Sequence, residues 1–483
     1  MYVGIDLGTS GLKAVILSEN GEVVATAAEP LPISRPKPLW SEQDPADWAA
    51  AMHKAMHALK RGHDLSAVKA VGLTGQMHGA VLLDKAHTVL RPAILWNDGR
   101  SFKECAELEA LVPRSRAITG NLMMPGFTAP KLKWVQTHEP DVFARVDKVL
   151  LPKDYLRLLM TGDFASDMSD AAGTMWLDVG RRNWSDELLA ACDLSRAHMP
   201  TLFEGNAVTG RLTPEVAADW GMNRVPVVAG GGDNAAGAVG VGLCSAGQAM
   251  LSLGTSGVYF VVSDGFRANP ERAVHSFCHA LPETWHLMSV MLSAAACLDW
   301  ACRLTRTADV ATLIAEVENG AEPATPLFFL PYLSGERTPH NNPDAKGTLH
   351  GFTHEHGPED VARAVLEGVG FGLADGMDAL HATGLKPHSI TLIGGGARSR
   401  FWRQMLADIT GETLDYRSGG ETGPALGAAQ LARLSAHPGV WPDELIPQPP
   451  LVETHRPNPE RHRLYRERLA TFRALYRHLS QLE

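Results

Sequence analysis

The first 30 residues alternate apolar runs with short turns that contain glycine. In MYVGIDLGTSGLKAVILSENGEVVATAAEP the turns are TSG and ENGE, and valine, isoleucine and leucine are frequent in the runs around them. Apolar runs bounded by Gly, Ser and Asn predict three antiparallel strands here. The pentapeptide LGTSG occurs at 7–11 and again at 253–257, inside QAMLSLGTSGVYFVVSDG. The pattern around the second copy again predicts a strand, a turn and a strand.

A second pattern also occurs once in each half of the chain. VPVVAGGGDNAAGAVG (225–240) and SITLIGGGARSRFWRQMLAD (389–408) each contain an apolar run, three glycines and a helix-forming segment. We interpret the two GGG segments as equivalent positions in an internal duplication. The first domain is then expected at residues 1–243 and the second at residues 244–440, with a further helix predicted over 358–380.

The remaining segment, 441–483, differs in composition from both halves. WPDELIPQPPLVETHRPNPE is rich in proline, which favours an extended linker. After it, apolar residues recur at helical spacing and predict a helix that docks on the body of the protein: Tyr465, Leu469, Phe472, Tyr476 and Leu479.

Composition narrows the class of protein. The chain has 483 residues, 45% hydrophobic and 20% charged, with a formal net charge of −10. It lacks the clustered Lys and Arg that nucleic-acid binding needs. It also lacks a secretion signal and an apolar run of the roughly 20 residues that span a bilayer, so no membrane partner is expected. The cysteines form no CxxC pair and indicate free thiols in a reducing cytoplasm: Cys105, Cys192, Cys244, Cys278, Cys297 and Cys302.

The residues beside the two repeats differ in charge. Asp6 precedes the first LGTSG and Ser252 precedes the second, while Asp233 follows the first GGG and Ala397 follows the second. We therefore expect acid/base or metal chemistry in the first domain and a site for a bulky planar group in the second. Two interpretations stay open for each carboxylate. Asp6 could hold Mg²⁺ or cap its own turn, and Asp233 could act chemically or cap its helix.

The glycine turns also predict phosphate binding. Tight turns and helix N-termini expose backbone N–H groups that bind phosphate well. Further donors would come from Thr9, Ser10, Lys13, Thr255 and Ser256. A single turn of this kind is an ordinary hairpin, but two copies favour a phosphate turn on each wall of a cleft. The P-loop motif is absent, and GGGDNA lacks the downstream acid of a dinucleotide site.

The combined motifs resemble those of the FGGY family of carbohydrate kinases, with DLGTSG and GGGD in one half and LGTSG and GGGA in the other. GFTAPKLKWVQTH (126–138) is similar to the first family signature. GTLHGFTHEHGPEDVARAVLE (347–367) is similar to the second, with Phe352 in place of a usual aliphatic residue. The resemblance implies an α/β fold of two duplicated ribonuclease-H-like domains, as in actin and hexokinase, facing a central cleft.

Longer segments resemble the branch of this family that acts on D-xylulose. They are LWSEQDP, GLTGQMHGA, ILWNDGR, TGNLMMPGFTAPKL, SDAAGTMWLDV, GGGDNAAGAVG and PYLSGERTPHNNP. The resemblance implies ATP-dependent phosphorylation of the C5 hydroxyl of D-xylulose, with closure of the two domains. Alternatives are a family member that acts on ribulose, gluconate or glycerol, or an ATPase switch of the actin or Hsp70 type.

The resemblance also assigns residues to roles. Asp233 would be the catalytic base and Asp6 an aspartate needed for activity, both beside Mg²⁺. The sugar would contact Met77, His78 and Asn234, with Gln76, Trp96 and Asp98 as further candidates. ATP would be held by Thr9, Ser10, Lys13, Gly254, Thr255, Gly395, Gly396 and Ala397. A homodimer is expected only because two-fold assemblies are the commonest kind.

Overall fold

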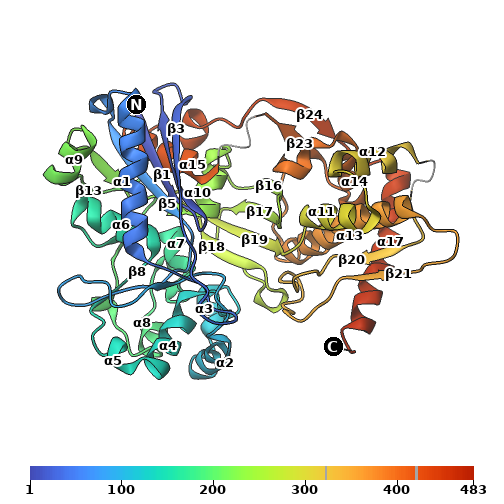
Figure 1. The fold of residues 1–483 in the computed structure, drawn as a ribbon, viewed down its shortest axis with the longest axis horizontal. Coiled ribbons are helices and arrows are strands. Elements are labelled where there is room, and N and C mark those ends of the chain that lie inside the picture. Colours follow the sequence, from blue (N-terminus) through green and yellow to red (C-terminus); the bar gives the residue numbers. More distant parts are fainter. Residues whose placement is uncertain (321–323, 419–422, 483) are drawn as a thin grey trace.

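Two seven-stranded mixed sheets organise the computed structural model, which describes residues 1–320, 324–418 and 423–482 (Figure 1). In spatial order the first sheet contains β13 (Val208–Arg211), β14 (Pro226–Val228), β5 (Ala70–Gly75), β1 (Tyr2–Leu7), β2 (Gly11–Leu17) and β3 (Val23–Pro30), and β15 (Gly231–Gly232) also pairs with β5. The second sheet contains β18 (His275–Cys278), β19 (Trp285–Met291), β17 (Gly257–Ser263), β16 (Gln248–Leu253), β22 (Ser389–Ile393), β23 (Leu414–Arg417) and β24 (Leu451–His455).

Both LGTSG segments form the predicted hairpin turns. β1 pairs with β2 and β2 with β3, all antiparallel, and β16 pairs antiparallel with β17. β1 is almost wholly buried because it lies in the middle of its sheet, whereas the edge strand β3 alternates between exposed and half-buried positions. The alternation therefore follows the place of each strand in the sheet.

The two halves repeat one order of elements. In the first half the order is β1, β2, β3, α1 (Pro45–Gly62), β5, α6 (Pro152–Thr161), β14 and α10 (Asp233–Gly240). In the second half it is β16, β17, β19, α13 (Pro358–His381), β22, α14 (Arg400–Thr410), β23 and α15 (Gly423–Ser435), with β18 added between β17 and β19. β1 and β5 are parallel, as are β16 and β22. This is the duplicated ribonuclease-H-like order that the resemblance implied.

The two GGG segments are not equivalent positions, and that part of the duplication hypothesis is wrong. The glycines before Asp233 follow β14, the last parallel strand of the first sheet. The glycines before Ala397 follow β22, whose counterpart in the first half is β5. In the repeated order of elements, α10 of the first half corresponds to α15 of the second half. The turn at 394–397 corresponds to the segment that begins at Gly75. The sequence similarity misled because any turn of this kind favours glycine.

α15 joins the two halves, since it lies between β23 and β24 of the second sheet in sequence but packs on the first sheet (Figure 1). A Cβ atom built on Gly427 would lie 1.7 Å from the carbonyl oxygen of Ala236 in α10. Cβ atoms on Gly4 of β1 and Gly72 of β5 would lie 2.0 and 1.9 Å from carbonyl oxygens of α15. Glycine is therefore required where α15 contacts α10 and the first sheet.

The other elements surround these two sheets. Short strand pairs in the first half are β4 (Glu42–Gln43) with β7 (Ala93–Ile94), β6 (Val81–Leu83) with β8 (Lys148–Leu150), β9 (Ala165–Asp167) with β12 (Thr201–Phe203), and β10 (Leu177–Asp178) with β11 (Asn183–Trp184). The second half adds β20 (Phe328–Leu330) with β21 (Thr348–His350). The remaining α-helices are α2 (Phe102–Leu111), α3 (Ser115–Thr119), α4 (Thr128–His138), α5 (Pro140–Phe143), α7 (Met168–Ala172), α8 (Asp186–Ala190), α9 (Pro214–Trp220), α11 (Ala296–Thr305), α12 (Val310–Asn319), α16 (Pro442–Leu445) and α17 (Pro459–Leu479).

The C-terminal segment is tied to the second half by a strand and a helix. β24, within the proline-rich stretch, pairs antiparallel with β23. In α17, Tyr465, Leu469 and Phe472 are buried in the core of the second half, and Arg473 forms an ion pair with Asp375 of α13 at 2.9 Å. The six cysteines are buried free thiols, as expected. None of the helices in the described ranges combines the length and apolar character needed to cross a bilayer.

The contact between α15 and α10 generates a prediction for Gly427→Ala. Alanine is the better helix former by about 1 kcal/mol, but here its methyl group would overlap α10. We expect the substitution to lower the free energy of unfolding by about 1–3 kcal/mol or more, measured by denaturant unfolding. Gly62→Ala, at the end of α1, is the control, because no described atom lies within 4 Å of its Cβ position. Equal effects at the two sites would contradict the packing argument.

Candidate active site

Two carboxyl groups meet at the carboxyl ends of the parallel strands of the first sheet. Asp6 of β1 lies opposite Thr74 of β5, and Thr74 in turn lies opposite Gly231 of β15. Asp233 follows β15 directly. The register therefore places Asp6 and Asp233 at one edge, which is where open α/β sheets bind ligands.

Asp6 is largely buried at the end of its strand. Its Oδ1 atom has no hydrogen-bond partner among the described residues. Burial raises the pKa of Asp6 to about 7, the negative charge of Asp233 raises it further, and Lys13 opposes the shift. Lys13 lies directly opposite Asp6 on β2. A carboxyl oxygen without a partner favours a ligand-binding role for Asp6 over the turn-capping alternative.

Asp233 is the first residue of α10, and the N-cap position belongs to Gly232. Its Oδ1 atom accepts hydrogen bonds from the backbone N–H of Asn234 at 2.8 Å and from the side-chain Nδ2 of Asn234 at 3.0 Å. Burial raises the pKa of Asp233 to about 6, and the two bonds from Asn234 partly oppose that shift. Asn234 therefore orients the carboxyl group. Asp233 is not the N-cap residue of α10, although its carboxyl accepts one N–H of the first helical turn.

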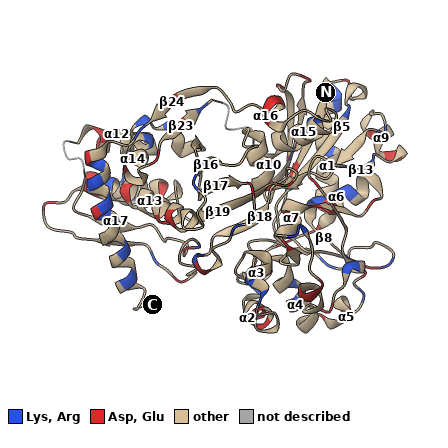
Figure 2. Cartoon of the chain, turned by 180° about the vertical axis from the view of Figure 1, so that it is seen from behind, with Lys and Arg blue, Asp and Glu red and all other residues tan. Residues whose placement is uncertain are grey.

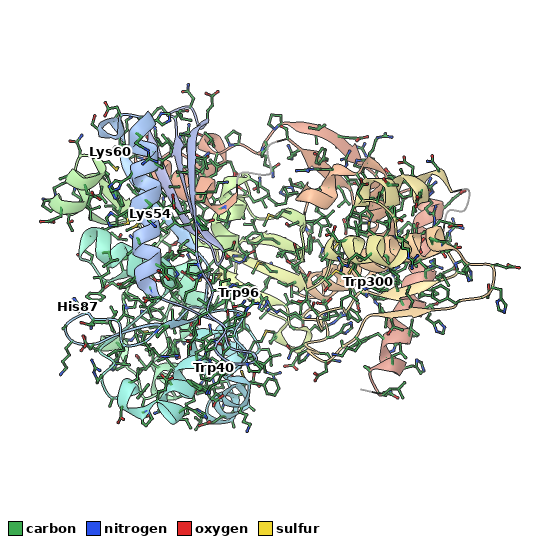
Figure 3. All side chains as sticks on the ribbon, viewed as in Figure 1. Trp40, Lys54, Lys60, His87, Trp96 and Trp300 are labelled. Carbon is green, nitrogen blue, oxygen red and sulfur yellow. The ribbon has the colours of Figure 1, made fainter. Side chains whose placement is uncertain are left out.

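The first glycine turn is held by four polar side chains. Trp96 Nε1 donates to Thr9 Oγ1 at 2.9 Å, and Thr9 Oγ1 donates to Gln76 Oε1 at 2.9 Å. Gln76 Nε2 donates to Gln43 Oε1, and Gln43 Nε2 donates to the carbonyl oxygen of Thr9 at 2.7 Å. Trp96, labelled in Figure 3, is 40% exposed. Residues predicted to hold the sugar are thus bonded to a residue predicted to hold phosphate.

Sequence analysis missed Gln43 as an individual residue. It lies in LWSEQDP, one of the segments that carried the resemblance, and Trp48 Nε1 donates to its Oε1 atom at 3.1 Å. The contacts of a buried amide depend on segments distant in sequence, so no local pattern indicated that Gln43 supports the turn.

His78 has a fixed orientation beside Met77. Its backbone is left-handed, with φ of 70°, and its Nδ1 donates to the carbonyl oxygen of Gly173 at 2.8 Å. Burial lowers the pKa of His78 to about 3, and Lys131 lowers it further. His78 is therefore neutral, and its Nε2 carries a lone pair that can accept a hydrogen bond from a sugar hydroxyl.

Asp98 is fully committed to protein partners. One oxygen accepts from the backbone N–H of Ser41 at 2.6 Å, and both oxygens accept from the Arg100 guanidinium at 2.7 and 2.9 Å. Arg100 in turn lies over the ring of Trp40. These contacts give Asp98 a structural role in holding its loop, and contact with a sugar stays a prediction.

The second half brings its two predicted nucleotide turns together. A Cβ atom on Gly394 would lie 2.8 Å from the backbone of Leu253, and one on Gly396 would lie 3.0 Å from the Leu253 side chain. The GGGA turn therefore packs against the residue that precedes Gly254. Gly395 has no described atom within 4 Å of its Cβ position, so it lies beside open space. Ala397 is fully buried, and its contact with a nucleotide stays a prediction.

Positively and negatively charged residues are interspersed along both halves of the chain (Figure 2). Thr255 is exposed, and its carbonyl oxygen accepts from the N–H of Ala294 at 2.9 Å. Ser10 is also exposed. Anion binding would therefore rely on local donors at the turns.

Comparisons with known proteins cover both halves. Residues 1–240 match the N-terminal domain of the FGGY family of carbohydrate kinases, and residues 249–436 match its C-terminal domain. The chain is 67% identical over 482 residues to a xylulose kinase of Escherichia coli (strain K12), covering 100% of each. A crystal structure of a xylulose kinase from Brucella ovis has a TM-score of 0.96 at 47% identity, covering 100% of each chain. A gluconate kinase structure from Lactobacillus acidophilus has a TM-score of 0.93 at 25% identity, covering 99% of this chain and 98% of that one.

The buried carboxyl of Asp6 generates a pH prediction for stability. Its pKa is about 7 in the folded protein against 3.8 as the ordinary value, so folding binds a proton between these pH values. The stability contributed by the protonated form is present below pH 4 and is lost as the pH rises through 7. Asp6→Asn should therefore be more stable than the parent at pH 8, by about 1–4 kcal/mol, with little difference at pH 4.

Denaturant unfolding of the metal-free protein at the two pH values measures this effect. Asp264→Asn is the control, because the Asp264 side chain is 74% exposed and no pH-dependent difference is expected there. A stability difference for Asp6→Asn that is the same at both pH values would contradict the assignment.

Proposed function

Because the chain belongs to the FGGY family of carbohydrate kinases, we propose that it transfers the γ-phosphoryl group of ATP to the C5 hydroxyl of D-xylulose. The products are D-xylulose 5-phosphate and ADP. The observation that carries the chemistry is the buried, oriented carboxyl of Asp233 beside that of Asp6 at the carboxyl edge of the first sheet. The choice of D-xylulose is supported by the 67% identity to the xylulose kinase of Escherichia coli.

Asp233 acts as the general base. Asn234 holds its Oδ1 atom with two hydrogen bonds, so we assign Oδ2 to the substrate hydroxyl. As the C5 oxygen attacks the γ-phosphorus, the hydroxyl proton passes to Asp233. With a pKa of about 6 the carboxyl is ionised at neutral pH and still basic enough to accept a proton. Such a base contributes about 10²- to 10⁴-fold in rate.

The sugar is held by hydrogen bonds from neighbouring side chains. His78 accepts a hydrogen bond from a sugar hydroxyl at Nε2, since its Nδ1 already donates to the carbonyl oxygen of Gly173. Met77 packs against Gly232, because a Cβ atom on Gly232 would lie 2.8 Å from the Met77 sulfur. Asn234 adds a polar contact beside the base. Hydrogen bonds to hydroxyl groups discriminate between sugars better than apolar contacts do.

The phosphates of ATP lie against the two LGTSG turns, and the adenosine lies against Gly395–Ala397. The Thr9 hydroxyl is already bonded to Trp96 and Gln76, so the backbone N–H groups of the turn and the exposed Ser10 hydroxyl are the phosphate donors that remain there. Because the two turns belong to different halves, the halves close during the reaction and exclude water. Transfer then depends on positioning and on stabilisation of charge.

Asp6 and Asp233 fit Mg²⁺ through the donor set that this ion prefers. Mg²⁺ takes oxygen ligands and is usually bound by one or two carboxylates together with substrate phosphates and water. The unpartnered Oδ1 of Asp6 fits this role. Within the described residues no group of three or more His, Cys, Asp or Glu forms a metal cage, so phosphate oxygens and water would complete the shell. Bound Mg²⁺ would neutralise charge on the transferring phosphate.

We place the enzyme in the cytoplasm, with support from its six free, buried thiols. A homodimer stays a prediction.

The substrate assignment predicts selectivity among sugars. In a coupled assay for ADP release, D-xylulose should give kcat/KM at least about tenfold above D-ribulose, L-ribulose, gluconate and glycerol, because mispaired polar groups cost affinity in the transition state. If another sugar or polyol in the panel gave an equal or higher kcat/KM, the assignment of D-xylulose as the substrate would be wrong. Sugar-independent ATP turnover as fast as the sugar-dependent rate would instead support the ATPase-switch alternative.

The base assignment predicts that Asp233→Ala and Asp233→Asn fold normally but lose at least about 10²-fold in kcat. Because both variants remove a buried charge, we expect their unfolding temperature to equal or exceed that of the parent. The measurements are steady-state kinetics and thermal unfolding of each variant. Turnover near that of the parent in Asp233→Asn would rule out the general base.

A further inference from the structure

A buried charged cluster lies behind the catalytic loop and is not used in the reaction described above. Lys153 Nζ lies 2.6 Å from Asp154, 2.8 Å from Asp167 and 3.2 Å from Asp170, and all four side chains are fully buried. Burial alone would lower the pKa of Lys153, but the three aspartates raise it, so Lys153 stays charged. Such a cluster is costly to bury, and it needs an explanation.

Asp167 connects this cluster to a single serine. Its Oδ1 atom faces Lys153, while its Oδ2 atom accepts the backbone N–H of Ser169 at 2.7 Å and the N–H of Asp170 at 3.2 Å. The Ser169 hydroxyl also donates to Oδ2 of Asp167. Because the hydroxyl proton is taken up in this bond, the lone pairs of Ser169 Oγ are fixed in direction.

The fixed lone pair of Ser169 meets the catalytic loop. The backbone N–H of Gly232 donates to Ser169 Oγ at 3.0 Å, and Gly232 is the residue before Asp233. On its other side Gly232 contacts Met77. The strand that leads into the loop is held as well, since Arg157 Nη2 donates to the carbonyl oxygens of Val228 and Ala229 at 2.8 and 2.6 Å.

The same short helix also holds the sugar side. α7 contains Ser169, and its C-cap residue, Gly173, accepts the bond from Nδ1 of His78. One rigid turn of chain thus contacts the loop of the general base at one end and a sugar-binding histidine at the other.

We propose that Ser169 is a positioning residue for the general base, and that the Lys153–Asp167 pair orients its hydroxyl toward Gly232. Through this chain of bonds α7 sets the distance between Asp233 and the sugar held by His78. The inference rests on the proposed role of Asp233 as the base. Ser169 is fully buried, and we assign its effect to the bond with the backbone of Gly232.

The test is Ser169→Ala, with Ser166→Ala as a matched control. Ser166 is equally buried and donates to Asp154 of the same cluster at 2.6 Å, yet within the described residues its side chain makes no hydrogen bond to the catalytic loop. A displaced base lowers the rate of transfer without weakening sugar binding. We expect Ser169→Ala to lower kcat about 10- to 100-fold with KM for D-xylulose within about threefold, and Ser166→Ala to keep kcat within about twofold.

Two further variants test the proposal if Ser169→Ala does not fold. Ser169→Thr and Ser169→Val have the same shape and differ in the hydroxyl, so overpacking affects both alike. Thr should keep at least about ten times the kcat of Val, per active site titrated by nucleotide binding. Equal kcat for this pair would overturn the proposal, as would equal losses in Ser169→Ala and Ser166→Ala. Failure of the proposed function differs, because Asp233→Asn would then stay active or the parent would not phosphorylate D-xylulose.

Discussion

The close contact between α10 and α15 is the constraint on which the rest of the structure depends. α10 begins with Asp233 and leads from the first sheet into the second half of the chain, and α15 returns from the second sheet to pack on the first. Because Gly427 has no Cβ atom, the two helices approach each other more closely than any larger residue at this position would allow. Because the chain passes between the halves directly after α10 and on both sides of α15, we expect movement of one half against the other to be accommodated at these two helices. Asp233, the proposed general base, therefore lies at the start of the helix that connects the two halves, beside the segment that domain closure would move.

Electrostatic cost is concentrated at the same edge. Burial raises the pKa values of Asp6 and Asp233 to about 7 and about 6, so each carboxylate lowers stability when it ionises. A hydrated surface carboxylate would avoid this cost but would be a weaker base and a poorer partner for phosphate-bound Mg²⁺. The chain offsets part of the cost at Asp233, whose Oδ1 atom accepts two hydrogen bonds from Asn234.

Much of this arrangement could be predicted from the sequence, and the limits have physical causes. The hairpins were predictable because strand and turn preferences are local, and the duplication was visible because LGTSG occupies equivalent turns. The equivalence of the GGG turns was wrong, since glycine marks a tight turn without saying which strand precedes it. Gln43 and Ser169 were missed because their roles depend on contacts 34 and 63 residues away in sequence. The tail strand β24 was not expected, since the two prolines before it indicated only extended chain.

The corrected equivalence also changes how the two halves divide their work. β5 ends at Gly75 and is followed by Gln76, Met77 and His78, and after the equivalent strand β22 the second half has the turn that ends in Ala397. One position of the duplicated fold therefore presents the side chains proposed to bind the sugar in one half and the glycine turn proposed to bind adenosine in the other. Asp6 and Ser252 remain a true equivalent pair, each opposite the parallel neighbour strand. In the proposed mechanism the duplication thus supplies two turns for phosphate. Substitutions at the ends of β1 and β5 would make one half acidic and suited to the sugar, while the other stays neutral.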